Sequence, residues 1–331
     1  MLNLYTSRAI RGGPPHDLNA TELPPGVVWL DLVKPEAAEI AFVERATGLH
    51  VPSREELSEI ESSSRLRSRD GALYLSTPLI YRTQAELPVS TPVGFVLTRD
   101  RLITVRYEEL TAFTNFIDRE LATDSEPLSS GAVFVELMDA IADRLADVLE
   151  HIAEELDTLS HRLFRVPAAQ TMRRRPPARE SADLRVILRR VGGYGDHVSK
   201  IRDSLLGIGR IAPYVASACA QWLPPEIKRR LETLRQDVAS LSDYDTHLVN
   251  KVQLLLDATL GLINVEQNNI IKVLTIVSVV GVPPTLVASI YGMNFKGMPE
   301  LDWSWGYPYG LAMIALSAVL PLLWFKWRGW F

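Results

Sequence analysis

Four serine and threonine side chains interrupt an uncharged stretch that runs from residue 273 to residue 295. They are Thr275, Ser278, Thr285 and Ser289, and their steps of three, seven and four place them on one face of a helix. Oxygens of this kind accept hydrogen bonds from the water shell of a cation. For hydroxyl groups alone, helix–helix contact and pore lining are equally good interpretations.

The polar stripe extends beyond the apolar stretch at both ends, and this favours a polar path. Toward the N-terminus it meets Asn268, Asn264, Gly261 and Asp257, and at the other end it meets Asn294. Residues 237 to 270 contain five acidic side chains and one basic side chain, which would attract cations to the inner mouth of such a path.

Two apolar runs, 273–295 and 303–325, carry no charge, and each is long enough to cross a hydrocarbon core of about 30 Å. Tryptophan and tyrosine residues gather at both ends of the second run, where interfacial belts fall in membrane proteins. Lys272 and the pair Lys326 and Arg328 flank the runs, and the positive-inside rule places these flanks in the cytosol. We therefore expect transmembrane helices at 271–292 and 305–326, an external loop at 293–304 and a cytosolic tail at 327–331.

The elements that must position the stripe are long helices. Residues 131–270 show helical periodicity, and no proline interrupts the sequence from residue 226 until Pro283. An unbroken helix from 226 to 291 would be about 100 Å long. Leucines recur every seven residues, at Leu241, Leu248, Leu255 and Leu262, which predicts packing against other copies of the chain.

Residues 1–130 have an α/β pattern. Strands are expected at 27–33, 93–98 and 101–107, with a helix at 36–47 that ends at Gly48. Ser53 and Glu56 form a capping-box pattern at the start of a further short helix. The glycines at 192, 193 and 195 predict a bend between helical segments.

Composition excludes several classes of function. The net charge is −5 and no domain is strongly basic, so nucleic acid is not an expected partner. Cys219 is the only cysteine, and the six histidines show no metal-ligand spacing. No catalytic constellation is recognisable, so we expect a protein that is not an enzyme and has no catalytic cofactor. The N-terminus lacks the apolar region of a signal peptide, which predicts a cytosolic N-terminal part.

One polar stripe cannot enclose a pore, so a symmetric homo-oligomer is expected. The chain resembles the CorA family of divalent cation transporters in Tyr291-Gly292-Met293-Asn294-Phe295, in Met298-Pro299-Glu300-Leu301 and in Gly306-Tyr307-Pro308. The resemblance implies a funnel-shaped homopentamer in the inner (plasma) membrane, with both termini in the cytosol. It also implies a cytosolic α/β domain, long stalk helices and two C-terminal membrane helices.

The resemblance also implies roles for particular residues. Asn294 would contact the hydrated ion, with Gly292 and Met293 shaping its loop, which suits Mg²⁺ because this ion dehydrates reluctantly. The positions expected to line the pore are Asn268, Ile271, Leu274, Val282, Thr285 and Ser289. The three apolar members of this set would form a constriction that gates by dewetting. Asp257 would bind regulatory Mg²⁺, with an acidic partner expected near residues 83–86.

The identity of the ion stays open at this stage. Magnesium-type members usually carry glutamate after the pentapeptide, whereas this chain has Lys296 and then Gly297; Glu300 follows in the same loop. The glycine resembles the Gly-rich element of the zinc-transporting branch, and this alternative includes coupling to protons. The Met-Pro-Glu-Leu element resembles the magnesium branch and favours Mg²⁺, with Co²⁺ and Ni²⁺ as further ions. A membrane-anchored sensor or scaffold is the alternative from another functional class.

Overall fold

The chain divides into two compact units in a computed structural model. We call residues 1–167 and 187–256 the sheet unit, and residues 168–186 and 257–331 the membrane unit. The structure describes all residues except 7, 8, 14, 16, 82–88, 123–128, 165–176, 294–296, 300–302 and 331. It describes the backbone but not the side chains of 9–13, 62, 120–122 and 177–181.

A seven-stranded sheet with the order β2-β1-β3-β7-β6-β5-β4 forms the base of the sheet unit. Strands β3 and β7 are parallel, and the other neighbouring strands are antiparallel. The strands are β1 (Leu2–Thr6), β2 (Ala9–Gly13), β3 (Val27–Val33), β4 (Leu66–Arg69), β5 (Ala72–Tyr81), β6 (Val89–Leu97) and β7 (Leu102–Arg106). The predicted strand at 27–33 and the hairpin that joins the strands near 93–98 and 101–107 are confirmed.

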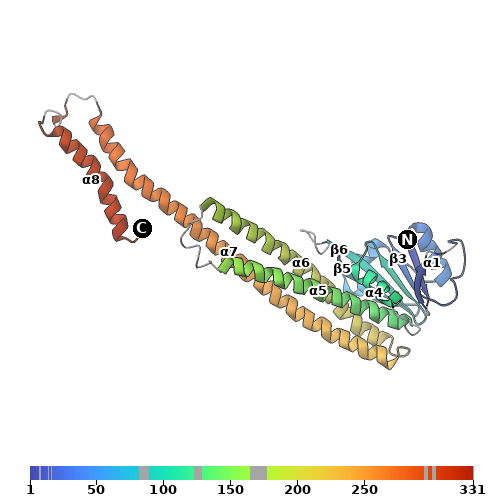
Figure 1. Cartoon of the computed structure of the whole chain (residues 1–331). Coiled ribbons are helices and arrows are strands. Elements are labelled where there is room, and N and C mark those ends of the chain that lie inside the picture. Colours follow the sequence, from blue (N-terminus) through green and yellow to red (C-terminus); the bar gives the residue numbers. More distant parts are fainter. Residues whose placement is uncertain are drawn as a thin grey trace. The chain divides into compact units, whose positions relative to one another are not determined.

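Helices cover both faces of this sheet, as Figure 1 shows. Because side chains alternate along a strand, Leu30 and Leu32 of β3 enter the core beneath α1 (Ala37–Thr47) and α2 (Arg54–Leu57). Trp29 points to the opposite face, where it meets aromatic side chains of α4 (Thr111–Ala122). The short helix α3 (Ser62–Arg65) precedes β4.

Local capping signals position these small helices as the sequence predicts. Ser53 accepts a hydrogen bond from the backbone N–H of Glu56 at 3.2 Å, and the Glu56 side chain accepts one from the Ser53 N–H at 2.8 Å. This reciprocal pair satisfies two N–H groups at the start of α2. Gly48 ends α1 in the left-handed conformation, with φ 71°, which glycine adopts without steric cost.

Helix α6 (Pro177–Ala218) runs through the glycines at 192, 193 and 195 without a break, so the predicted bend is wrong. Each helical glycine costs about 1 kcal/mol relative to alanine. Buried side chains on both sides of the cluster, Val191 and Val198, hold the helix in place and offset that cost. Gly207 has a packing role, since a Cβ there would lie 1.9 Å from Thr77 Oγ1 on β5.

The long predicted helix is confirmed as α7 (Pro225–Tyr291), which has 67 residues. Its residues up to 256 belong to the sheet unit, together with α5 (Ser130–Phe164) and most of α6. Leu248 and Leu255 are each only 1% exposed within a single chain, so the prediction that they pack against other copies is wrong. They pack inside the chain because α5 and α6 flank α7, where Lys251 pairs with Asp157 at 2.8 Å.

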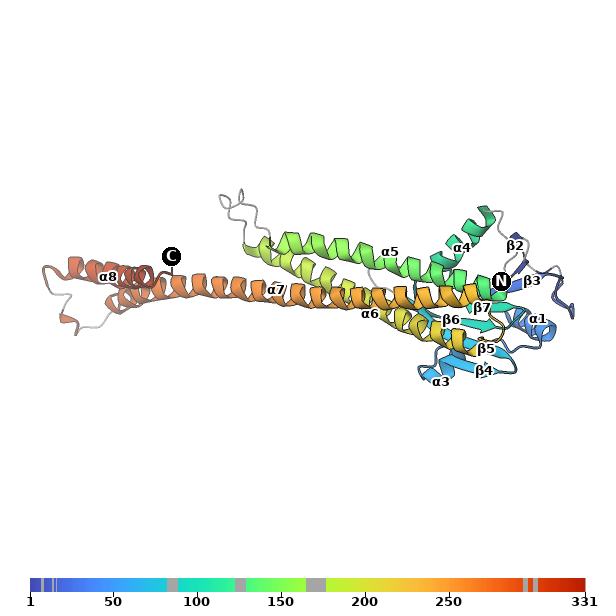
Figure 2. The same ribbon diagram turned by 90° about the horizontal axis from the view of Figure 1, so that it is seen from below.

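The membrane unit contains the later part of α7 and α8 (Gly306–Trp327). Both helices are long and apolar enough to cross a membrane. Figures 1 and 2 show α8 running back beside α7, in the antiparallel direction that a short connection requires.

Candidate ion pathway on the membrane unit

The two membrane helices each have one half-buried face. On α7 this face includes Lys272, Ile276, Val280, Pro283, Val287 and Tyr291, and Thr275 and Pro284 are half-buried as well. On α8 it consists of Gly306, Gly310, Ile314, Ser317, Pro321 and Phe325, of which Phe325 is fully buried. Steps of three and four residues put each set on one side of its helix. These two faces therefore pack against each other within one chain.

The predicted pore positions lie on a different side of α7, which a single chain leaves uncovered. Ile271, Leu274 and Val282 are 60%, 65% and 62% exposed. Asn268, Thr285 and Ser289 are exposed as well. We call the six residues together the free face of α7. Because apolar side chains in this set are as accessible as polar ones, other molecules must complete their surroundings.

The threonines near this face present acceptor oxygens. Thr285 donates its hydroxyl proton to the carbonyl oxygen of Gly281 at 2.9 Å, and Thr275 donates to that of Ile271 at 2.8 Å. Each proton is held by the helix backbone, so the lone pairs of each oxygen stay directed outward. An outward lone pair suits the hydrogen atoms of a cation's water shell.

A shallow groove of about 530 Å³ follows the same part of α7. It is lined by Val277, Ser278, Gly281, Val282, Thr285, Leu286 and Ser289. Pro283 and Pro284 lie inside the helix and have no N–H, so the carbonyls of Val279 and Val280 lack their usual helical donors. Backbone acceptors released at membrane depth are tolerated where they meet protein or water.

The motif that follows α7 is only partly described. The N–H of Gly292 donates to the carbonyl of Ala288 at 3.0 Å, and the N–H of Met293 donates to that of Ile290 at 3.2 Å. A Cβ at position 292 would lie 3.2 Å from the Ala288 carbonyl oxygen, so glycine suits this tight helix end. Asn294, Lys296 and Glu300 lie outside the described residues.

Asp257, the predicted regulatory ligand, is exposed on α7. The segment expected to supply its acidic partner, residues 83–86, lies outside the described residues. Among the residues that the structure does describe, no group of three or more His, Cys, Asp or Glu side chains could hold a metal ion.

An ion-pair network that sequence reasoning missed joins α4, α5 and α7 in the sheet unit. Arg230 of α7 bonds to Glu136 and Asp139 of α5, and Arg119 of α4 bonds to Glu136 at 2.8 Å. Burial raises the pKa of Asp139, and the hydrogen bond from Arg230 opposes that rise. The bond to Glu136 raises the pKa of Arg230. No sequence spacing signals this network, because Arg230 lies 94 residues from Glu136 and 91 residues from Asp139.

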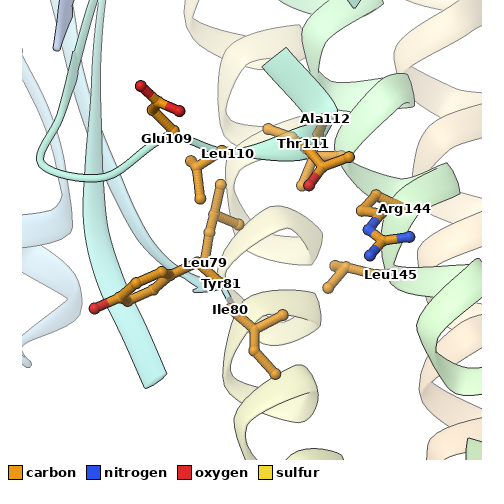
Figure 3. A pocket seen from close by; sticks show the side chains of 10 residues that line it. Leu79, Ile80, Tyr81, Glu109, Leu110, Thr111, Ala112, Arg144 and Leu145 are labelled. Carbon is orange, nitrogen blue, oxygen red and sulfur yellow. The ribbon is translucent and has the colours of Figure 1, made fainter. Parts of the chain in front are cut away.

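The sheet unit also contains a small cavity of about 50 Å³ between the end of β5, the segment before α4, and α5. Figure 3 shows Leu79 and Ile80 facing Leu145 across it, with Arg144 at its edge. This volume has room for a few water molecules. It is far smaller than the pockets that bind metabolites, which are typically about 300 Å³ or more.

Comparison with known proteins agrees with the membrane architecture. A family model for CorA-like Mg²⁺ transporter proteins matches residues 25–327. The magnesium transport protein CorA of Yersinia pseudotuberculosis is 32% identical over 306 residues, which cover 92% of each chain. The magnesium transport protein CorA of Escherichia coli K12 is 32% identical over 303 residues, with 92% of each chain covered.

A solved structure shares the whole fold. The complete CorA magnesium transporter of Methanocaldococcus jannaschii matches with a TM-score of 0.74 at 16% identity, covering 100% of this chain and 98% of that one. The fold likeness and the curated relatives point the same way. The chain therefore belongs to the family of CorA-like Mg²⁺ transporter proteins.

Proposed function

We propose that this chain carries Mg²⁺ across the inner membrane through a path lined by the free face of α7. The observation that carries the proposal is the accessibility of that face, where polar acceptors alternate with apolar side chains inside a membrane-length helix. Membership of the CorA-like family supports the choice of ion. An inside-negative membrane potential would drive the divalent cation inward without a pump.

The complete path requires several copies of the chain, and we propose a homopentamer. A single free face cannot surround an ion. In this arrangement residues 1–130 and 131–270 form a cytosolic domain and stalk, and helices at 271–292 and 305–326 cross the membrane. Residues 293–304 form the external loop, and the tail at 327–331 is cytosolic.

Ion selection is assigned to a ring of Asn294 side chains at the outer end. Amide oxygens there would accept hydrogen bonds from the water shell of Mg²⁺, which dehydrates reluctantly. Further inward, Ile271, Leu274 and Val282 would form the constriction, since apolar rings block ions when they dewet. Asp257 would bind regulatory Mg²⁺ and stabilise the closed state.

Flux into liposomes that contain a Mg²⁺-sensitive dye tests the proposal. Wild-type protein should carry Mg²⁺, and Asn294→Ala should lose most of that flux. Ser317→Ala is a matched control, because this hydroxyl lies on α8 and donates to its own helix at Ile314. Correctly inserted wild-type protein without flux would support the scaffold or sensor alternative.

A zinc transporter is the second candidate, and Gly297 after Lys296 favours it. The same vesicles should be compared with Mg²⁺, Co²⁺, Ni²⁺ and Zn²⁺, with and without a pH gradient. Mg²⁺ flux that is independent of the gradient, with Co²⁺ and Ni²⁺ also carried, supports the magnesium proposal. Zn²⁺ flux that requires a gradient would contradict it.

A further inference from the structure

The C-terminal end of α8 folds into a defined cap that turns Trp330 back toward the helices. The N–H of Trp330 donates to the carbonyl of Phe325 at 3.0 Å, and the N–H of Gly329 donates to that of Lys326 at 3.1 Å. Gly329 has φ 71°, the left-handed conformation that glycine adopts at this position. The two bonds together form a Schellman motif, which fixes the direction in which the chain leaves the helix.

The cap places the indole of Trp330 against both membrane helices. Its ring stacks on Phe325, with centroids 5.1 Å apart and planes at 27°. The same ring lies 5.6 Å from the ammonium nitrogen of Lys272 on α7, which is a cation–π distance. The end of α8 lies beside α7 in both Figures 1 and 2. Trp330 therefore connects the tail of α8 to one residue of α7.

The position of Lys272 gives this contact a consequence for the pore. Lys272 directly follows Ile271 and precedes Leu274 by two residues, and both of these belong to the free face. Lys272 itself is half-buried on the face toward α8. A contact that holds Lys272 toward α8 therefore fixes the rotation of α7 and keeps Ile271 and Leu274 on the opposite side.

We infer that Trp330 is a positioning residue for the apolar constriction of α7. Its contact with Lys272, which we call the latch, holds α7 in the rotation that presents this constriction to the path. This inference rests on the proposed function. When the latch is intact, Ile271 and Leu274 face the path and the constriction stays dry. Loss of the latch releases α7 to rotate, and the closed state becomes less stable.

A second cation–π pair at the same membrane level supplies a matched control. The guanidinium of Arg328 lies 5.3 Å from the ring of Trp324. Because these residues are both at the C-terminal end of α8, their contact does not bridge to α7. Trp324→Leu removes an aromatic ring and a cation–π contact without altering Lys272, Phe325 or Trp330.

The first arm of the test measures the internal Mg²⁺ concentration that halves flux in liposomes. Trp330→Leu and Lys272→Met should each raise it by about threefold to tenfold, as expected for the loss of one cation–π contact. The double variant should show no larger change than either single variant. Trp330→Phe and Lys272→Arg should keep most of the wild-type value, and Trp324→Leu should not change it. Effects that multiply in the double variant, or an equal effect of Trp324→Leu, would overturn the inference.

The second arm does not depend on transport. A cysteine introduced by Ile271→Cys, with Cys219→Ala to remove the native thiol, is labelled with a hydrophilic thiol reagent at saturating Mg²⁺. Adding Trp330→Leu should change the labelling rate by about threefold or more, since α7 can then rotate. An unchanged rate would overturn the latch even if Mg²⁺ flux is normal. Absence of wild-type flux with a changed rate would instead reject the proposed function alone.

Discussion

The sheet unit and the membrane unit treat their apolar side chains in opposite ways. In the sheet unit, Leu30 and Phe95 are completely inaccessible to solvent, because helices of the same chain cover the sheet. In the membrane unit, Leu274 and Val282 on the free face of α7 are more than 60% exposed. The first unit is completed by its own sequence. The second leaves apolar side chains on the free face of α7 that its own chain does not cover.

The sheet unit also pairs buried charges with partners from its own chain. Asp31 accepts hydrogen bonds from Arg106 at 2.8 Å and from the Thr104 hydroxyl at 2.7 Å, and all three residues are buried. Trp29 completes the network with a bond to Thr104 at 3.0 Å. Substitutions in this network should therefore affect folding, whereas substitutions on the free face should affect transport.

Arg106→Met should have the largest effect, because it leaves the Asp31 carboxylate buried without its charge partner. We expect a loss of about 3–5 kcal/mol in the free energy of unfolding. The measurement is denaturant unfolding of the full-length protein in detergent, followed by circular dichroism. Lys34→Met is the control, since it breaks the Lys34–Glu108 pair, whose lysine is exposed and whose glutamate is half-buried, and such a surface pair contributes about 0–1 kcal/mol. Equal losses in the two variants would contradict the account of the sheet unit.

Asp245 on α7 is a buried acid with fewer hydrogen bonds than Asp31. It predicts that the free energy of unfolding depends on pH. Arg202 bonds to one carboxylate oxygen at 2.8 Å, while the other has no hydrogen-bond partner. Burial raises the pKa of Asp245, and the bond from Arg202 opposes the rise. A raised folded-state pKa means that the charged form weakens the fold. This side chain therefore favours folding below its unfolded pKa and loses that contribution as pH rises through its folded pKa.

Asp245→Asn should accordingly raise the free energy of unfolding at pH 7 by about 1 kcal/mol, because Arg202 is half-exposed and regains water. The gain should shrink as the pH falls through the raised folded-state pKa of Asp245, because the wild-type carboxyl then becomes protonated. Thermal unfolding of both proteins at a series of pH values measures this gain in the free energy of unfolding. Asp243→Asn is the control, because Asp243 is exposed. A gain that is independent of pH would show that the charge of Asp245 is not its source.

Asp257→Ala should separate regulation from folding. Asp257 is exposed, so the free energy of unfolding should change by no more than about 0.5 kcal/mol. The Mg²⁺ concentration that protects the protein from limited proteolysis should rise by about fivefold, the lower end of typical coupling between sites. Asp243→Ala, an exposed acid on the same helix, should leave protection unchanged. The same protection curve for both variants would make Asp257 an ordinary solvated residue.

Lys296→Glu should have the smallest effect. Reversing this charge in the proposed external loop should raise Mg²⁺ flux about twofold at low ionic strength and less at high ionic strength, because salt screens the interaction. Lys296→Gln should give about half of the change on a logarithmic scale. An increase that does not depend on salt would place the side chain away from the path of the ion.

The parts of this molecule that follow from the sequence are those with local signals. Ser53 and Glu56 cap α2 as their spacing predicts, and the uninterrupted run before Pro283 forms one helix. The bend predicted at the glycine cluster is wrong, and so is the prediction that Leu248 and Leu255 contact other copies, because packing within the chain decided both. The Lys272–Trp330 contact could not be predicted, since two residues far apart in sequence meet there. Gly329 was its one local signal, as a glycine that follows the end of α8.

The most direct test of the central claim is block of Mg²⁺ flux by a thiol reagent at single cysteines on α7. In a Cys219→Ala background, Thr285→Cys places the thiol on the free face, and Val287→Cys places it on the face toward α8. We expect a hydrophilic reagent to block flux through the Thr285→Cys variant and to leave the Val287→Cys variant active. Unchanged flux after complete modification at position 285, verified by mass spectrometry, would show that the free face of α7 does not line the path.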